Sequence, residues 1–338
     1  MRRSRLIYTA VVRPVMSYGS QIWSIRGDGE AAAKNLLYPL QKVQNQCLRR
    51  VTGAYKRTPI AALEREAAVH PLDLYTEITA LQRASTTAHY PVTTDINEAR
   101  QAVWNSAKQL ASQRQARRRR NVPEPRCPDT PIEMLRKRAK KKEAEAVEYL
   151  RSKVEARRPA QRRGNATRIG GHQYQYKSTT LITRWADLEW KRRWSKAARG
   201  KSATTWINPW ELRTIPLYER LKKHEATALF LLRTEVIGLN AWLAAVGVPG
   251  ILPRCACDYR EQTVEHVLLA CPLYADTRAP LLIQARSNVL KQMLSTPEGA
   301  QAAAQWLVRN RILLHLSAAA QINREEILGQ APFPELAR

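Results

Sequence analysis

The sequence predicts a mainly α-helical protein, on three observations. Apolar residues recur at steps of three and four over long parts of the chain, as they do on one face of an amphipathic helix. No stretch alternates apolar and polar residues over the length of a half-buried strand. The sequence also contains no internal repeat of the kind that builds solenoids or propellers. We therefore expect helices throughout, grouped into three blocks.

The first block, residues 1–110, is predicted to be a compact helical domain. A helix over 3–25 is interrupted by a Tyr-Gly pair at 18–19, and an amphipathic helix over 36–51 is ended by Gly53. The apolar face of the second helix is formed by Leu36, Leu40, Val43, Cys47, Leu48 and Val51.

Two more helices are expected in this block. Thr58 and Pro59 have the residue types of an N-cap and a first-turn proline, so a helix should begin there and run to about residue 68. A His-Pro pair at 70–71 stops this helix. A further helix is predicted over 72–90, because its apolar residues share one face.

The second block, residues 111–180, is predicted to be a basic linker, a charged helix and a partly disordered connector. Residues 111–130 hold four consecutive arginines and several prolines, which is typical of a linker. The helix is expected over 131–158, whereas 159–180 show no periodicity. Between residues 114 and 163 there are 18 basic against 7 acidic side chains, so this segment should attract anions.

The third block, residues 181–338, is predicted to be helical with a small zinc knuckle at 255–272. Residues 181–200 have two apolar edges, which is typical of a helix that packs between neighbours. The most apolar helix is expected over 225–246, and a last helical pair over about 277–328.

The net charge of the chain indicates which class of partner it binds. The chain carries 56 Lys and Arg against 29 Asp and Glu, a net charge of +27. Such a surplus repels itself in a compact fold unless polyanions neutralise it, so we expect RNA and/or DNA as partner, with an anionic membrane surface as the rival. No run of 18 apolar residues could span a membrane, and Arg13 and Pro14 interrupt the apolar N-terminal stretch, which excludes a signal peptide.

The five cysteines are dispersed and odd in number, so they do not indicate a disulfide framework. A reducing compartment fits them better, and with a nucleic-acid partner we expect an intracellular, nuclear location. Cys47 lies in an apolar helical stripe and is interpreted as a small buried hydrophobe. Cys127 lies in the linker, where the sequence offers it no partner.

Four residues near the C-terminus have the types and spacing of a metal site: Cys255, Cys257, His266 and Cys271. Three thiols and one imidazole complete a tetrahedral set for Zn²⁺, which in a structural site leaves no position open for water. The sequence therefore predicts a structural rather than a catalytic zinc. The alternative, three free thiols beside a core histidine, is disfavoured because four ligands fall within 17 residues.

The local sequence suggests how these side chains meet. Thr263 is placed to cap a short helix whose first turn carries His266, and Cys271 follows past the end of that helix, before a proline. The second imidazole N–H is expected to find one of three nearby carboxylates, Asp258, Glu261 or Glu265.

Basic residues in three tracts are the candidates for phosphate contacts. The alternatives are a solvated helix face or a nuclear-localisation signal. Three tryptophans interleaved with the third tract could stack bases, although tryptophans at helical spacing are more often core residues. The candidate cations are Arg117, Arg118, Arg119 and Arg120, then Arg136, Lys137, Arg138, Lys140, Lys141 and Lys142, then Lys191, Arg192 and Arg193; the tryptophans are Trp185, Trp190 and Trp194.

The sequence contains no recognisable active site. Two-metal nucleotidyl transfer needs clustered carboxylates, and none of the seven aspartates adjoins another. A glycine-rich phosphate loop and a nucleophilic triad are also missing. We therefore expect no enzyme activity from this chain on its own.

Long strings at both ends resemble one family. LIYTAVVRPVMSYGSQIW and LQKVQNQCLRRVTGAYKRTPIAALEREAAVHPLDL are similar to the region just downstream of the polymerase palm in non-LTR (LINE-type) retrotransposon reverse transcriptases, especially those of filamentous fungi. EATALFLLRTEVIGLNAWLAAVGVPGILPRCACDYREQTVEHVLLACP is similar to the terminal segment and zinc knuckle of that family. Together the strings cover roughly half of the chain, in the family's order.

The resemblance implies that residues 1–110 correspond to the thumb-like region that grips the primer–template duplex, and that the four Cys and His residues are the family's knuckle ligands. The family's polymerase chemistry depends on a paired-aspartate motif upstream of what is residue 1 here, so no catalytic residue carries over. Mg²⁺ would be a cofactor only together with that polymerase domain. The RNase H domain that many relatives carry between the two regions has no convincing counterpart in the basic middle of this chain.

We expect a C-terminal fragment of such a reverse transcriptase, which binds RNA and/or DNA through its basic tracts and knuckle and lacks a polymerase site of its own. Two alternatives stay open. One is a truncated gene model of an active RNA-directed DNA polymerase, which a paired-aspartate motif in frame upstream of Met1 would show. The other is a non-functional element remnant whose zinc site only holds a tail fold. The sequence gives no indication of the oligomeric state.

Overall fold

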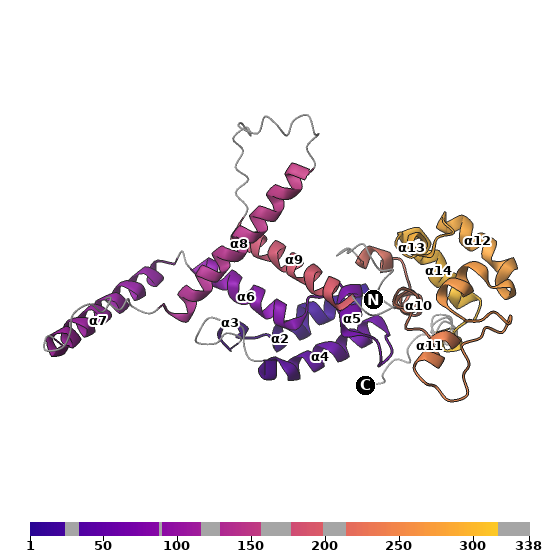
Figure 1. The fold of residues 1–338 in the computed structure, drawn as a ribbon, viewed down its shortest axis with the longest axis horizontal. Helices are drawn as coiled ribbons and strands as arrows, with labels where there is room; N and C mark the ends of the chain where they lie inside the picture. Colours follow the sequence, from indigo (N-terminus) through magenta and orange to yellow (C-terminus); the bar gives the residue numbers. More distant parts are fainter. Residues whose placement is uncertain (24–33, 88–89, 116–128, 157–176, 199–213, 317–338) are drawn as a thin grey trace, which may run out of the picture. The chain divides into compact units, whose positions relative to one another are not determined.

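The structure is a computed structural model and describes residues 1–23, 34–87, 90–115, 129–156, 177–198 and 214–316 (Figure 1). These residues form helices and turns without any β-strand, so the predicted mainly α fold is confirmed. None of the helices in these ranges is long and apolar enough to cross a membrane. Most of the predicted linker and connector, residues 116–128 and 157–176, lies outside the described residues.

Contacts between residues divide the chain into two units. Unit 1 comprises Met1–Met16, Gln41–Pro71 and Arg193–Arg338, and unit 2 comprises Ser17–Leu40 and Leu72–Arg192. Each unit therefore joins segments that are distant in the sequence. The division into three blocks at residues 110 and 180 stays a prediction.

Unit 1 is built around α10, Lys223–Thr234, in which every residue except Lys223 and Glu225 is buried. This helix packs against α14, Pro297–Arg309, which also contacts α12 and α13. The other helical segments of unit 1 are α1 (Arg2–Ile7), the π-helical turn η1 (Tyr8–Val12), α2 (Arg13–Met16), the second part of α4 (Lys34–Thr52), α5 (Ile60–Glu66), η4 (Ile215–Tyr218), α11 (Asn240–Ala245), η5 (His266–Ala270), η6 (Pro272–Tyr274), α12 (Ala275–Ala285) and α13 (Leu290–Met293).

Unit 2 centres on α6, Leu72–Thr87, which packs against α8, Pro131–Ala156, and α3, Ser20–Trp23. The predicted apolar face of α6 is buried, with Leu74 and Leu81 fully enclosed and Ile78 nearly so. The side-chain amide of Gln82 on α6 donates to the Thr183 hydroxyl at 3.0 Å and so ties α6 to α9 (Ser178–Ala198). The remaining helices of the unit are α7 (Pro91–Gln115) and most of α9.

The start of α8 is fixed by a capping box at Thr130 and Glu133. The Thr130 N–H donates to Glu133 Oε2 at 2.7 Å, and the Glu133 N–H donates to Thr130 Oγ1 at 3.3 Å. The Thr130 N–H and the Arg100 guanidinium lower the pKa of Glu133 to about 2. The cap therefore contributes its full stability above the ordinary glutamate pKa, and loses it as the pH falls through about 2.

The predicted helix over 225–246 is wrong, because the structure has two helices there, α10 and α11. The chain turns at Glu235, which adopts a left-handed conformation with φ +53°, and the turn buries Val236 and Ile237 in the core. These apolar residues continue the helical pattern across the break, which is why the sequence suggests a single helix.

Two other expectations are also corrected. In place of a helical pair over 277–328 the structure has α12, α13 and α14, and residues from 317 onward lie outside the described part. Thr58 does not cap α5, because the extended Pro59, with ψ 136°, takes the cap position itself. The Thr58 hydroxyl is buried and has no hydrogen-bond partner among the described residues.

Gly53 ends α4 as predicted, and replacing it by alanine should destabilise unit 1. Its φ of +75° lies in the left-handed region, which costs an L-residue about 1–2 kcal/mol. A Cβ at this position would lie 2.3 Å from Oγ1 of Thr227 on the buried α10, so one of the two helices must move. We expect Gly53→Ala to lower the free energy of unfolding in urea by about 3 kcal/mol.

Gly250→Ala is the matched control, because Gly250 has the same φ of +75° but nothing within 4 Å of its Cβ position. Equal losses for the two variants would contradict the close approach of α4 and α10.

Candidate metal centre

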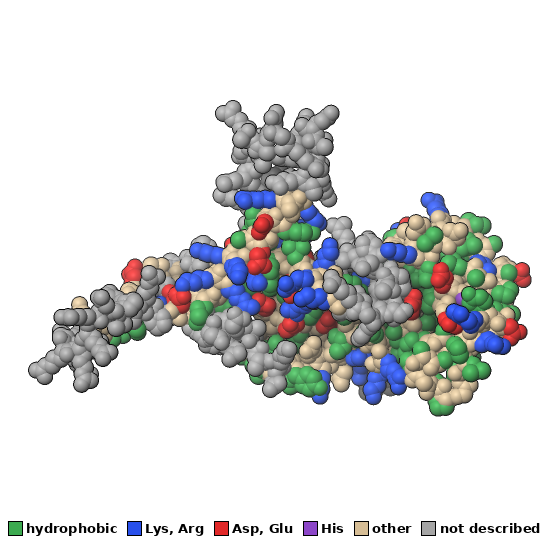
Figure 2. Space-filling view, in the orientation of Figure 1, with side chains coloured by type: hydrophobic (Ala, Val, Ile, Leu, Met, Phe, Trp, Pro, Cys, Tyr) green, Lys and Arg blue, Asp and Glu red, His purple; other side chains and the backbone are tan. Residues whose placement is uncertain are grey.

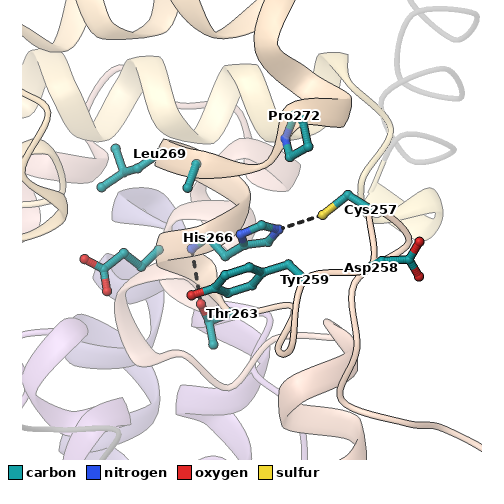
Figure 3. Close-up of a pocket in the computed structure, with 9 residues that line it drawn as sticks. Cys257, Asp258, Tyr259, Thr263, His266, Leu269 and Pro272 are labelled. Carbon is teal, nitrogen blue, oxygen red and sulfur yellow. Dashed lines mark hydrogen bonds between the residues drawn. The ribbon is translucent and has the colours of Figure 1, made fainter.

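The four predicted ligands converge on one point in unit 1. Cys255 and Cys257 lie on the turn after α11, His266 begins η5, and Cys271 follows directly after η5. Their four ligand atoms all lie within 4.8 Å of one another. The Cys255 and Cys271 sulfurs are 3.8 Å apart, and the Cys257 sulfur is 3.2 Å from Nε2 of His266 (Figure 3). The four residues are therefore close enough to hold a metal ion.

Backbone hydrogen bonds shape both halves of this centre. The Asp258 N–H donates to the Cys255 carbonyl at 3.0 Å, the Cys255 N–H donates to the Tyr259 carbonyl at 2.9 Å, and Asp258 is left-handed with φ +66°. On the other half, the His266 N–H donates to Oγ1 of Thr263 at 3.1 Å, which confirms the predicted cap. The chain leaves η5 at Cys271, which is extended, with φ −60° and ψ 121°.

The centre is continuous with the core of unit 1. Val264, Val267 and Leu268 belong to the buried cluster that also contains the apolar residues of α10 and α14. Arg278 of α12 donates from Nε to the Leu268 carbonyl at 3.1 Å and from Nη2 to the Cys271 carbonyl. Its positive charge lies beside a ligand set that carries negative charge once the thiols ionise.

The second nitrogen of His266 differs from expectation. Nδ1 is buried and has no hydrogen-bond partner among the described residues, so the predicted carboxylate partner is wrong. The Tyr259 ring lies parallel to the imidazole instead, with centroids 4.3 Å apart and an interplanar angle of 6° (Figure 3). The carboxylate of Asp258 points away from the two rings in the same view. Stacking on Tyr259, together with the contact between Nε2 and the Cys257 sulfur, therefore orients the imidazole.

Protonation of the ligands favours metal binding at His266 and opposes it at Cys271. Burial lowers the pKa of His266, and the charge of Arg278 lowers it further, so the imidazole is neutral, as a ligand must be. Burial raises the pKa of Cys271 to about 11. For Cys257, burial is outweighed by hydrogen bonds that include the Tyr259 N–H, so its pKa is lowered. Without a bound ion the Cys271 thiol is therefore protonated at neutral pH, and binding a metal ion requires it to ionise.

An open pocket of about 620 Å³ lies beside the stacked rings. It leaves the Tyr259 side of the centre accessible, and 56% of Tyr259 is exposed. The pocket is lined by Cys257, Asp258, Tyr259, Thr263, Glu265, His266, Leu269, Ala270 and Pro272.

The basic tract on α8 divides into cations with internal partners and cations that face solvent. Figure 2 shows Lys and Arg side chains gathered over α8, with acidic side chains between them. Arg138 pairs with Glu77 at 2.7 Å, and Lys142 lies 4.3 Å from the centroid of the Trp185 ring. Arg136 donates to a backbone carbonyl of α6, and Lys137 pairs with Asp129.

Lys140 and Lys141 are the two cations of this tract that remain for a ligand. Both are exposed, and neither forms an ion pair within the part of the chain that the structure describes. The other two predicted tracts give less support for a phosphate-binding surface. Arg117 to Arg120 lie outside the described residues, and Lys191 and Arg192 are exposed, with Arg192 paired to Glu189 at 2.6 Å. Arg193 is half-buried.

The three tryptophans of α9 are core residues. Trp185 is 5% exposed, Trp190 4% and Trp194 3%. Base stacking on these rings is therefore excluded, and the second apolar edge of α9 serves packing.

A buried ionic network in unit 1 has no signature in the sequence. Arg233 of α10 donates from Nε to Oε2 of Glu66 at 2.7 Å and from Nη2 to Oε1 at 3.0 Å, and the Tyr218 hydroxyl donates to Oε2 at 2.5 Å. Glu66 is 0% exposed. Glu66 is more than 150 residues from both Tyr218 and Arg233 in the sequence, so only the fold brings it to them.

Comparison with protein-family models, with curated proteins and with solved structures finds no match. The resemblance to non-LTR reverse transcriptases therefore stands on the quoted strings alone.

Proposed function

We propose that the ion held by the four ligands is Zn²⁺ in a structural role. Two sulfurs bound to one tetrahedral zinc at about 2.3 Å lie about 3.8 Å apart, and a disulfide would bring them to about 2.05 Å. The observed Cys255–Cys271 separation is 3.8 Å. The widest separation of 4.8 Å leaves a closing movement of about 1 Å at most. Four protein ligands leave no position for a reacting water, which supports folding rather than catalysis.

The protein as a whole, in this proposal, binds RNA and/or DNA in the manner of the C-terminal region of non-LTR reverse transcriptases, which the strings at its ends resemble, without a polymerase site among its own residues. The net charge of +27 supports it, together with the solvent-facing, unpaired Lys140 and Lys141. The family rests on the resemblance of the strings at both ends of the chain. A nuclear location belongs to the same proposal, since the partner is found there.

Salt dependence tests this binding. For the full chain, log K for a 20-nucleotide RNA should fall linearly with log salt concentration, because phosphate contacts release counterions. The double variant Lys140→Ala with Lys141→Ala should weaken binding and reduce the slope by about 1.4, since each lost contact to a single strand removes about 0.7. Fluorescence anisotropy over a salt series measures both quantities.

The charge-matched control is Arg286→Ala with Lys291→Ala, which removes two exposed cations from unit 1. If this control changes the slope as much as the α8 variant, binding follows net charge and has no site on α8. A wild-type chain without salt-dependent binding would refute nucleic-acid binding altogether.

A second candidate is favoured by the charges around the knuckle. Asp258, Glu261 and Glu265 surround it, and three of its ligands, Cys255, His266 and Cys271, are buried. These features suit a site that holds the fold better than a surface that meets phosphates. If the zinc-loaded chain binds no polynucleotide, this candidate, a structural zinc in a chain without nucleic-acid function, takes precedence.

A further inference from the structure

Three aromatic rings from distant segments of unit 1 meet beside a basic loop. Tyr55 follows α4, Trp242 lies on α11, and His315 follows α14. The Tyr55 and Trp242 rings are stacked, with centroids 5.5 Å apart and an interplanar angle of 21°. His315 lies against Tyr55 with a centroid distance of 6.2 Å, and its Nε2 is 3.5 Å from the Tyr55 hydroxyl. The sequence offers no hint of this cluster, because its members span 260 residues.

The loop that carries Tyr55 is strongly basic. Residues 49–57, RRVTGAYKR, hold four cations and no acidic residue. Arg57 donates from Nη1 to the Val246 carbonyl at 2.8 Å and so ties the loop to the end of α11. Arg49 donates to the Lys56 carbonyl at 3.2 Å and stiffens the loop from within. The backbone of the loop is therefore held beside the end of α11.

Several cations here face solvent without an acidic partner. Lys56 and Arg57 are exposed, as is Arg311 on the turn before His315. None of the three forms an ion pair with a carboxylate among the described residues. Lys56 and Arg57 directly follow Tyr55, and Arg311 lies four residues before His315, so the cations come from two of the segments that supply the rings.

The rings are accessible from solvent. His315 is exposed, Tyr55 and Trp242 are half-buried, and no residue of α11 is fully buried. Trp242 also borders an open pocket of about 420 Å³, which lies within the size range of small-ligand sites. The pocket is lined by Glu235, Ile237, Leu239, Ala241, Trp242, Ala245, Gln262, Thr263, Val264 and Glu265.

We infer that this surface binds single-stranded nucleic acid, with an unpaired base on Trp242 and the adjoining phosphates on Lys56 and Arg57. The inference rests on the proposed function and deepens it by naming the strand state and the site. Aromatic side chains next to cations are the arrangement by which proteins hold single strands without sequence preference. The two carboxylates of the pocket, Glu235 and Glu265, can accept hydrogen bonds from N–H groups of a base, such as the ring N3–H of thymine or the amino groups of the other bases, which a phosphate cannot offer. A duplex keeps its bases stacked and would leave Trp242 unused.

The test compares three probes on the full zinc-loaded chain: a 20-nucleotide thymidine oligomer, an abasic oligomer of equal length, and a 20-base-pair duplex. Trp242→Leu should weaken binding of the thymidine oligomer about 5- to 150-fold and leave the abasic oligomer unchanged, because only bases stack. Trp242→Phe, which keeps an aromatic face, should stay close to wild type. Lys56→Ala with Arg57→Ala should weaken both oligomers and lower their salt slope by about 1.4.

The variants must keep one zinc per chain, and if Trp242→Leu does not fold, the single variant Lys56→Ala, at an exposed position that leaves the Arg57–Val246 bond in place, carries the test through its lower salt slope. Equal weakening of thymidine and abasic oligomers by Trp242→Leu would overturn the inference, as would duplex binding equal to that of the single strand. Competition by a poly-glutamate peptide as strong as that by thymidine would also overturn it, in favour of an acidic partner.

If wild type binds polynucleotides and none of these variants changes binding, the inference fails while the proposed function survives. If wild type binds none of the probes, both fail.

Discussion

Removing the proposed Zn²⁺ from the Cys3His site is expected to destabilise the C-terminal part of unit 1. The centre is continuous with the core through Val264, Val267 and Leu268, so its four side chains cannot separate without disturbing buried apolar residues. Structural zinc contributes on the order of 10 kcal/mol in small zinc-dependent domains. Because other core contacts remain here, we expect chelation or Cys271→Ala to lower the free energy of unfolding by about 5 kcal/mol. Urea unfolding followed by circular dichroism measures the loss, and native mass spectrometry counts the metal.

Cys47→Ala is the control for this experiment. Cys47 is half-buried on α4 and lies outside the ligand set, so its removal should leave one metal per chain and cost about 1 kcal/mol. Unchanged unfolding in Cys271→Ala, or in the chelated wild type, would show that the four residues do not form a stabilising metal site.

The metal centre could be predicted from the sequence because it is local. Its four ligands fall within 17 residues, and the cap that positions His266 is supplied by Thr263, three residues away. Helix α7, Pro91–Gln115, was not predicted, but α6 was predictable for the same reason as the metal centre, since its apolar stripe spans only a few turns. The break at Glu235 was not predictable from the sequence, because its apolar neighbours match the helical period. Only the fold shows that these neighbours are buried in the core at a turn between two helices.

Contacts between distant segments could not be predicted from the sequence. The composition of α8 indicates a basic tract, but only the packing of α6 and α9 against it shows that Arg138 and Lys142 have internal partners and that Lys140 and Lys141 do not. The burial of the α9 tryptophans could not be predicted from the sequence either. Their interleaving with cations suits base stacking, and the fold buries them.

The buried network of Glu66, Arg233 and Tyr218 should be the second large contributor to the stability of unit 1. Replacing Glu66 by glutamine leaves the Arg233 guanidinium buried without a counter-charge, which typically costs about 3–5 kcal/mol. Arg233 also donates to the Leu294 carbonyl, so the network joins α5 and α10 to the turn after α13, and its loss should loosen all three. Urea unfolding of Glu66→Gln against wild type at neutral pH measures the effect.

An exposed ion pair gives the matched control. Glu219 lies 3.6 Å from Arg2 at the surface, so Glu219→Gln should change the free energy of unfolding by about 0.5 kcal/mol or less. Comparable losses in the two variants would mean that burial adds nothing to the Glu66 pair.

The same network predicts how stability depends on pH. Burial by itself would raise the pKa of Glu66, but the charge and hydrogen bonds of Arg233 outweigh it, so the folded-state pKa lies below the ordinary value near 4.5. A carboxylate with a lowered folded pKa contributes stability that is complete above its unfolded pKa and is lost as the pH falls through the folded value. Wild-type stability should therefore fall below about pH 4.5, and Glu66→Gln should flatten that fall, whereas Glu219→Gln should not. Glutamine cannot titrate. If the free energy of unfolding falls equally steeply with falling pH in wild type and in Glu66→Gln, the acid sensitivity of unit 1 comes from groups other than Glu66.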